Sequence, residues 1–181
     1  QSLLEVGSGG GLICEELGRR GAMTLGIDPS EGAIQTARLH ARQSGLGQNV
    51  TFEQGYAEAL PFANGSFSTI VCLDVLEHVE DLAATLDEIS RVLAPGGVFI
   101  FDTINRTWLS RLVLIWIGER FFQKYGLVPG LHEYQRFITP GELRAHLSAR
   151  GLHIQELVGF TPHIVKGRLT LSPGWFKSIS Y

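Results

Sequence analysis

The sequence predicts an α/β fold in which a mostly parallel sheet carries helices on both faces. Short apolar runs typical of buried strands recur through the first half of the chain. Amphipathic stretches at helical spacing separate most of these runs, and a glycine-rich turn follows the first of them. Because a connection between neighbouring parallel strands needs a crossover, this alternation predicts a sheet covered by helices.

The elements of the first half follow from apolar spacing and from residues typical of helix ends. Ile13 and Leu17 stand four positions apart and predict the buried side of a first helix, which Gly21 ends. The largely apolar run 67–73 is typical of an interior strand, because a half-exposed strand would alternate. In chain order we expect a strand at 3–6, a helix at 12–20, a strand at 22–27, a helix from Pro29 to before Gly45 that buries Ile34, Ala37 and Ala41, a strand starting at 50–52, a strand at 67–73, a helix over 82–93 and a strand at 98–102.

The regular alternation stops at Thr103. Residues 108–122 are very apolar for a surface helix, and they are too few to span a bilayer. An ordinary amphipathic helix is expected at 140–150, and strands are expected at 153–160 and 177–181. The second half therefore differs in organisation from the first.

Composition limits what the protein does. A chain of 181 residues with 44% hydrophobic and 18% charged residues is typical of one globular domain, residues 1–181. A net charge of -3 without a cluster of Lys and Arg excludes a nucleic-acid-binding surface. Cys14 and Cys72 lie in apolar context and are interpreted as core residues. The chain opens directly on its first strand, so we expect additional N-terminal residues to complete the site.

The glycine-rich turn is the first candidate for a ligand site. In an open parallel sheet, ligands bind beyond the carboxyl ends of the strands, and both this turn and Asp28 lie at such ends. A dinucleotide motif beginning at Gly7 requires a sixth residue that is glycine, and Leu12 stands there. Glycine occupies instead every second position from Gly7 to Gly11, and an acid, Glu5, precedes them.

This pattern resembles the first motif of the class I methyltransferases that use S-adenosylmethionine. The segments Leu60-Pro61-Phe62, Leu73-Asp74 and Pro95-Gly96-Gly97 follow in the order and spacing of that superfamily. The resemblance implies a Rossmann-like, mostly parallel seven-stranded sheet with an antiparallel last strand.

The same resemblance implies where S-adenosylmethionine binds. The glycines would receive its methionine end, Asp28 would bond the ribose hydroxyls, Tyr56 and Ala57 would flank the adenine, and Leu73 would pack near the sulfonium. Tyr56 stands where many relatives have an acid that bonds the adenine amine. The implied cofactor-binding residues are Glu5, Gly7, Gly9, Asp28, Tyr56, Ala57 and Leu73.

A more specific resemblance spans essentially the whole chain. The segments 72–79, 103–106 and 132–143 are together similar to the ubiquinone-biosynthesis O-methyltransferases. This implies methylation of a ring hydroxyl of a polyprenylated catechol or of demethylubiquinol. Two alternatives stay open: a class I methyltransferase for another quinone, a sterol or a secondary metabolite, and a non-catalytic cofactor-binding partner in a biosynthetic complex.

Acidic and histidine side chains supply the candidates for chemistry. Asp74, Glu77 and His78 would share one face if their segment turns helical, and these ligand types suit Mg²⁺ or another divalent cation, which would lower the pKa of a bound catechol oxygen. The alternative is that Glu77 and His78 only cap or pack. His132 and His78 are the candidate catalytic bases, because a neutral imidazole can take a phenolic proton near neutral pH.

Residues 103–139 are predicted to form a substrate lid. Within it, the apolar run 108–122 either completes the core over the site or contacts the membrane, where a polyprenyl tail would keep the substrate. We favour peripheral membrane contact through Trp108, Trp116, Phe121 and Phe122. We therefore expect a cytoplasmic protein at the inner face of the membrane, or on the matrix side of a mitochondrial one.

Overall fold

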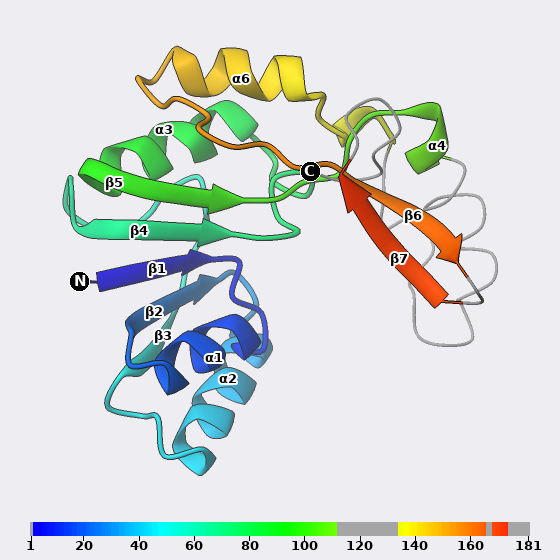
Figure 1. The fold of residues 1–181 in the computed structure, drawn as a ribbon. Coiled ribbons are helices and arrows are strands. Elements are labelled where there is room, and N and C mark those ends of the chain that lie inside the picture. Colours follow the sequence, from blue (N-terminus) through cyan, green and yellow to red (C-terminus); the bar gives the residue numbers. More distant parts are fainter. Residues whose placement is uncertain (1, 112–133, 166–167, 174–181) are drawn as a thin grey trace. The chain divides into compact units, whose positions relative to one another are not determined.

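The computed structural model describes residues 2–111, 134–165 and 168–173 of the chain. The chain divides into two compact units, Gln1–Phe101 and Asp102–Tyr181. The first unit contains the glycine turn and every strand of the large sheet (Figure 1). The grouping of both units into one domain and the lid at 103–139 stay predictions.

A five-stranded parallel sheet forms the centre of the first unit. Its strands lie in the order β3-β2-β1-β4-β5, and all four neighbouring pairs are parallel. Strand β1 is therefore central, and the direction of strand progression reverses between β1 and β4. The strands are β1 (Ser2–Val6), β2 (Met23–Asp28), β3 (Val50–Gln54), β4 (Phe67–Cys72) and β5 (Leu93–Phe101).

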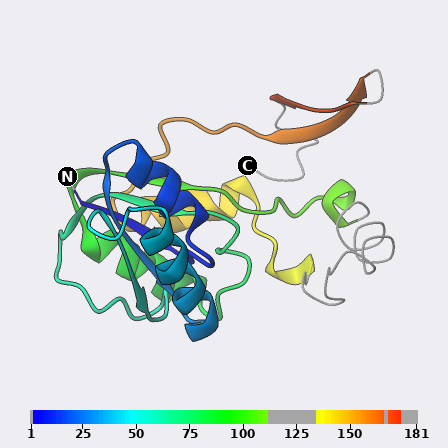
Figure 2. The ribbon, with the colours of Figure 1, turned by 90° about the horizontal axis from the view of Figure 1, so that it is seen from below.

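Three helices cover this sheet: α1 (Leu12–Arg19), α2 (Glu31–Gln43) and α3 (Leu82–Val92). From β1 the chain proceeds outward to β3, and from β4 it proceeds in the opposite direction to β5. Because such crossovers are right-handed, α1 and α2 lie on one face and α3 lies on the other, as Figures 1 and 2 show. The predicted parallel sheet with helices on both faces is confirmed.

Of the two helix faces predicted to be buried against the sheet, that of α2 is confirmed and that of α1 is wrong. Ile34, Ala37 and Ala41 of α2 are buried as predicted. In α1, however, Ile13 is 38% exposed, and the buried side carries Cys14 and Gly18 instead. A Cβ atom built on Gly18 would lie 2.3 Å from a methyl carbon of Val50, so α1 contacts β3 too closely for large side chains. The buried side of α1 therefore has a small residue, Gly18, where it contacts β3.

In the second unit, the segment that follows β5 contacts the residues at the start of a later helix. It contains α4 (Trp108–Ser110), the short 3₁₀ helix η3 (Tyr134–Arg136) and α6 (Pro140–Ser148). Asn105 and Ile138 form an isolated parallel bridge, and Arg106 forms an ion pair with Glu142. Thr139 caps α6 by accepting a hydrogen bond from the Glu142 N–H, while the Glu142 carboxylate accepts one from the Thr139 N–H.

The last strands differ from the expected ones. Residues 153–159 contain no strand, whereas β6 (Phe160–Val165) and β7 (Arg168–Pro173) pair antiparallel in a sheet of their own. Their pairing extends from Phe160 with Pro173 to Val165 with Arg168. The expected strand 177–181 lies outside the described residues. Within the described part, the large sheet has five strands rather than the seven expected.

Candidate active site

The glycine turn leaves β1 at the edge of the sheet where the strand order reverses. The N–H groups of Gly7 and Ser8 both donate to the Ile27 carbonyl of β2, at 2.8 and 3.0 Å. Gly7 has a φ of +76°, and a Cβ there would lie 2.2 Å from a methyl carbon of Val75. Only glycine fits this position, because both the backbone and the neighbouring turn exclude a side chain.

Asp28 joins the turns that follow β1, β2 and β3. Its Oδ2 accepts the Gly9 N–H and its Oδ1 accepts the Ser30 N–H, each at 2.9 Å. Its backbone carbonyl accepts the Gly55 N–H at 3.1 Å. The carboxylate predicted to bond a ribose thus also fixes the glycine turn, a role that the sequence did not indicate.

The space beside the glycine turn is open to a ligand. Gly9 has a φ of +48°, and a Cβ built there would meet nothing within 4 Å. The same is true of a Cβ on Gly10. Open space next to the Asp28 carboxylate at a strand-order reversal fits a ligand with hydroxyl groups that approaches the backbone closely.

Glu5 is placed beneath this site. It is 4% exposed, and its Oε2 accepts the N–H of Cys14, the third residue of α1, at 3.0 Å. Because Gly11 at the helix start offers no side-chain cap, Glu5 satisfies a backbone donor that the first turn leaves without an intrahelical partner. Burial raises the pKa of the Glu5 carboxyl, and the hydrogen bonds from Cys14 oppose that shift.

Cys14 and Cys72 are both free and buried, as the sequence predicted. Burial, with the neighbouring Glu5 carboxylate as the next cause, raises the pKa of the Cys14 thiol far above its ordinary value. A thiol of this kind is a core group and not a nucleophile.

The loop after β3 carries the residues predicted to flank an adenine. The loop begins at Gly55, whose N–H donates to the Asp28 carbonyl. Tyr56 is 62% exposed, and Ala57 is partly buried. Glu58 accepts the Glu80 N–H through its Oε1 at 2.9 Å. The loop therefore starts at the same edge as the glycine turn, which is where the expected contact requires it.

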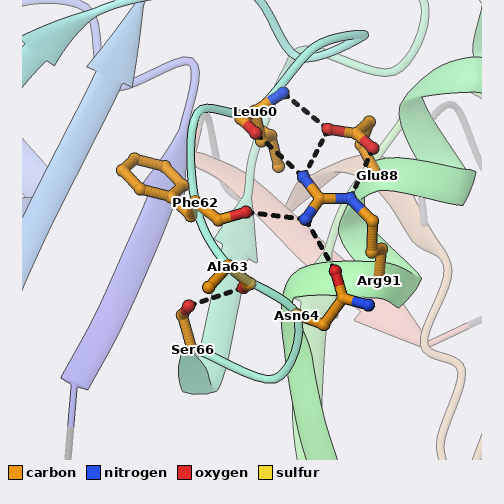
Figure 3. Close-up of polar contacts among 7 residues, drawn as sticks. All are labelled: Leu60, Phe62, Ala63, Asn64, Ser66, Glu88 and Arg91. Atoms are coloured by element: carbon orange, nitrogen blue, oxygen red, sulfur yellow. Dashed lines mark hydrogen bonds and ion pairs between the residues drawn. The ribbon is translucent and has the colours of Figure 1, made fainter.

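Two residues of α3 that the sequence analysis did not single out hold the end of this loop (Figure 3). Glu88 accepts the Leu60 N–H at 2.7 Å, and Arg91 donates to the Leu60 and Phe62 carbonyls at 2.8 and 2.6 Å. The hydrogen bonds from Arg91 also lower the pKa of the Glu88 carboxyl. Their spacing of three residues predicts a helical ion pair. The contacts with the loop carbonyls have no sequence signal.

The segment after β4 does not form the helix on which the metal prediction was conditional. Residues 76–78 form a hydrogen-bonded turn in which the His78 N–H donates to the Val75 carbonyl at 2.8 Å. Leu73 is partly buried, and Asp74 has a φ of +54°. A non-glycine residue in this left-handed region is uncommon, and such residues cluster at functional sites.

The predicted metal site is therefore not supported. Glu77 is 3% exposed whereas Asp74 and His78 are exposed, so the three side chains do not share one face. Across the described residues, no group of three or more His, Cys, Asp or Glu side chains is placed to hold a metal ion. The helical spacing on which the prediction depended is absent because the chain turns instead.

The remaining predictions concern the second half. His132 and residues 112–122 of the apolar run lie outside the described residues. Trp108, which is described, is 72% exposed. In the described part of the chain, no helix has the length and apolar character needed to cross a membrane.

Comparison with known proteins identifies methyltransferases. A family described as a methyltransferase domain matches residues 4–101. A SAM-dependent methyltransferase from Methanosarcina mazei is 26% identical in sequence, with a TM-score of 0.71 over 94% of this chain and 88% of its own. A second one, from Thermotoga maritima, shares the fold with a TM-score of 0.68 at 21% identity, over 99% of this chain and 78% of its own.

Two curated relatives are more similar in sequence. The ubiquinone biosynthesis O-methyltransferase of Burkholderia vietnamiensis is 38% identical over 170 residues, covering 93% of this chain and 72% of the relative. That of Azorhizobium caulinodans is 37% identical over 165 residues, covering 91% of this chain and 64% of the relative. The chain thus spans less than two thirds of the second relative.

The glycine turn, the acid that ends β2 and the family match together define a class I methyltransferase, and its cofactor is S-adenosylmethionine. Within this class, the chain belongs to the family of the ubiquinone biosynthesis O-methyltransferases.

The raised pKa of Glu5 predicts that its contribution to the free energy of unfolding depends on pH. Because its pKa is raised in the folded state, the folded protein binds this proton more tightly than the unfolded chain does. The stability that the proton contributes is present below the ordinary pKa and is lost as the pH rises through the folded-state pKa. Glu5→Gln retains an oxygen acceptor for the Cys14 N–H but does not ionise. The unfolding free energy of the wild type minus that of Glu5→Gln should therefore decrease from about pH 4 to about pH 7 in urea titrations.

The control is Glu53→Gln, which removes one negative charge from an exposed position on β3. A wild-type minus Glu5→Gln difference that stays constant over this range, or follows the control, would contradict the prediction.

Proposed function

We propose that this chain transfers the methyl group of S-adenosylmethionine to a ring hydroxyl of a polyprenylated catechol or demethylubiquinol in ubiquinone biosynthesis. The observation that carries the proposal is the similarity to relatives of that name, at 37% and 38% identity over more than nine tenths of the chain. The similarity includes the second unit, where a substrate-specific part of the protein would lie. The acceptor that we propose is therefore a phenol, which the fold alone does not specify.

S-adenosylmethionine would supply a methyl group on a positively charged sulfur; a phenolic oxygen would bond the methyl carbon as the carbon–sulfur bond breaks and S-adenosylhomocysteine leaves. The protein then has to align the two reactants and accept one proton. We assign the methionine end to the turn that contains Gly7 and Gly9, and the ribose to the Asp28 carboxylate. The open space beside Gly9 and the place of Asp28 at its edge support this assignment.

The other contacts follow the order of the loops. We assign the adenine to Tyr56 and Ala57, because their loop starts at the Asp28 carbonyl. Leu73, which follows β4, is assigned to the neighbourhood of the sulfonium. Glu5 acts indirectly, since its carboxylate caps α1 beneath the glycine turn.

An imidazole is the proposed acceptor of the phenolic proton. His78 is exposed on the turn after β4, and this turn contacts the glycine turn through Val75. His132 is the second candidate and lies outside the described residues. Because Asp74, Glu77 and His78 do not fit a three-ligand metal site, no step is assigned to a divalent cation.

The Asp28 assignment predicts a loss of cofactor affinity on substitution. Asp28→Ala removes the acceptor for the Gly9 and Ser30 N–H groups as well as the proposed ribose contact. Hydrogen bonds to a charged group contribute about 1.5–3 kcal/mol, so the Kd for S-adenosylhomocysteine should rise at least about tenfold in calorimetry. Glu53→Ala, at an exposed acid on the neighbouring strand, should leave the Kd unchanged. Equal affinity of Asp28→Ala and wild type would refute the assignment.

The proposed acceptor predicts which phenol is methylated. With S-adenosylmethionine labelled on its methyl group, we expect label on a ring hydroxyl of a prenylated catechol in detergent, with a higher kcat/KM than for a soluble catechol. Label only on an amine or a carbon acid would show a methyltransferase of another small molecule. Cofactor binding without any labelled product would show a non-catalytic partner.

We further propose that residues 108–122 contact the membrane surface in which a prenylated acceptor resides. The exposed Trp108 supports this, because tryptophan is favoured at the membrane interface. Trp108→Ser should lower co-sedimentation with liposomes about tenfold, given about 1.5–3 kcal/mol for burying a large apolar side chain. Leu39→Ser, at another exposed apolar residue, is the matched control. Equal binding by wild type and both variants would remove the membrane proposal.

A further inference from the structure

We propose that Glu88 and Arg91 of α3 are positioning residues for the adenine side of the cofactor site. They would act on the cofactor indirectly, by fixing the loop on which Tyr56 and Ala57 lie. This inference rests on the proposed binding of S-adenosylmethionine and identifies a determinant of its affinity that lies on the opposite face of the sheet from α1 and α2.

The loop needs fixing because of the path it takes. It leaves β3 at the edge of the sheet and reaches β4, with β2 and β1 lying between these two strands in the sheet order. No helix or strand occurs between Gln54 and Phe67. A long connection without secondary structure samples many conformations unless specific contacts restrain it.

The restraints stand on both sides of the two proposed adenine contacts. Before them, the Gly55 N–H donates to the Asp28 carbonyl at 3.1 Å. After them, the buried Leu60 has its N–H bonded to Glu88 and its carbonyl bonded to Arg91. The segment from Tyr56 to Ala59 therefore lies between two fixed points, and within it the Ala59 N–H donates to the Tyr56 carbonyl at 3.2 Å and Glu58 accepts the Glu80 N–H. Together these contacts leave the segment few conformations.

Arg91 uses its whole guanidinium group in this network (Figure 3). Two contacts at 2.7 Å, from Nε and Nη2, go to the Glu88 carboxylate. Nη2 also donates to the Leu60 carbonyl at 2.8 Å, and Nη1 donates to the Phe62 carbonyl at 2.6 Å and to Asn64 Oδ1 at 3.0 Å. The ion pair with Glu88 is enough to stabilise α3 locally. The three contacts from Arg91 to the loop are therefore additional to what the helix requires.

The geometry also makes arginine specifically suited to this position. A planar guanidinium reaches several acceptors in fixed directions, whereas a lysine ammonium is a single point of charge. Glu88 in turn orients the guanidinium and accepts the Leu60 N–H with the same carboxylate. Replacement of either residue should therefore loosen the loop, with lysine restoring only part of the function.

The test compares ligand affinity in matched variants of the full chain. Arg91→Met should raise the Kd for S-adenosylhomocysteine about tenfold in calorimetry well below the melting temperature, and it should raise the Kd for adenosine by the same factor. Arg91→Lys and Glu88→Gln should show smaller increases. Arg20→Met removes an arginine from a helical ion pair with Glu16 on α1 and should leave both Kd values unchanged.

A second measurement detects the loop itself. In the ligand-free protein, hydrogen exchange at the amides of residues 56–60 should be faster in Arg91→Met than in Arg20→Met. If Arg91→Met does not fold, the graded effects of Arg91→Lys and Glu88→Gln on Kd carry the same test.

Three outcomes would overturn the proposal. A lower melting temperature with unchanged Kd would make the pair merely structural. An increased Kd for S-adenosylhomocysteine without one for adenosine would exclude an effect at the adenine side. Failure of the wild type to bind S-adenosylhomocysteine would reject the proposed cofactor site itself, and is distinguishable because no variant is needed to see it.

Discussion

The arrangement of the site depends on one aspartate that receives backbone donors from three successive turns. The Gly9 and Ser30 N–H groups bond its carboxylate, and the Gly55 N–H bonds its carbonyl. These groups follow β1, β2 and β3, so one residue sets the relative positions of all three connections at the ligand edge. The carboxylate has lone pairs beyond those used by the backbone, so the proposed ribose contact is compatible with its role in fixing the turns.

Two acids near the glycine turn serve different purposes because their surroundings differ. Glu5 is buried inside the sheet, where its carboxylate accepts a helix N–H and burial raises its pKa. Asp28 stands at the end of its strand and is only partly buried. The inner acid supports the helix that follows the turn, and the outer acid is the one available to a ligand. Residue type alone does not separate these roles, whereas position along the strand does.

The sequence was most informative where a local rule determines the structure. Strand and helix alternation, the glycine turn and the acid at the end of β2 follow from periodicity and backbone geometry, and the structure has all of them. Ile13 was misplaced because close packing of Gly18 on Val50 decides which side of α1 is buried. The helix on which the metal prediction depended is absent, because Asp74 takes a left-handed conformation and residues 76–78 form a turn. Contacts between distant segments, such as Arg91 with the Leu60 carbonyl, have no local sequence signal.

The contacts of Arg91 also bear on the chemical ageing of the protein. Asn64 precedes Gly65, and an asparagine followed by glycine loses ammonia readily when the glycine nitrogen attacks the side-chain amide. Here the Gly65 N–H donates to the Arg91 carbonyl at 2.9 Å, and Asn64 Oδ1 accepts from the Arg91 guanidinium at 3.0 Å. Cyclisation requires the Gly65 nitrogen to lose its proton, so the hydrogen bond from this N–H to the Arg91 carbonyl disfavours the reaction. We therefore expect this loop to lose ammonia more slowly than an unrestrained Asn-Gly sequence.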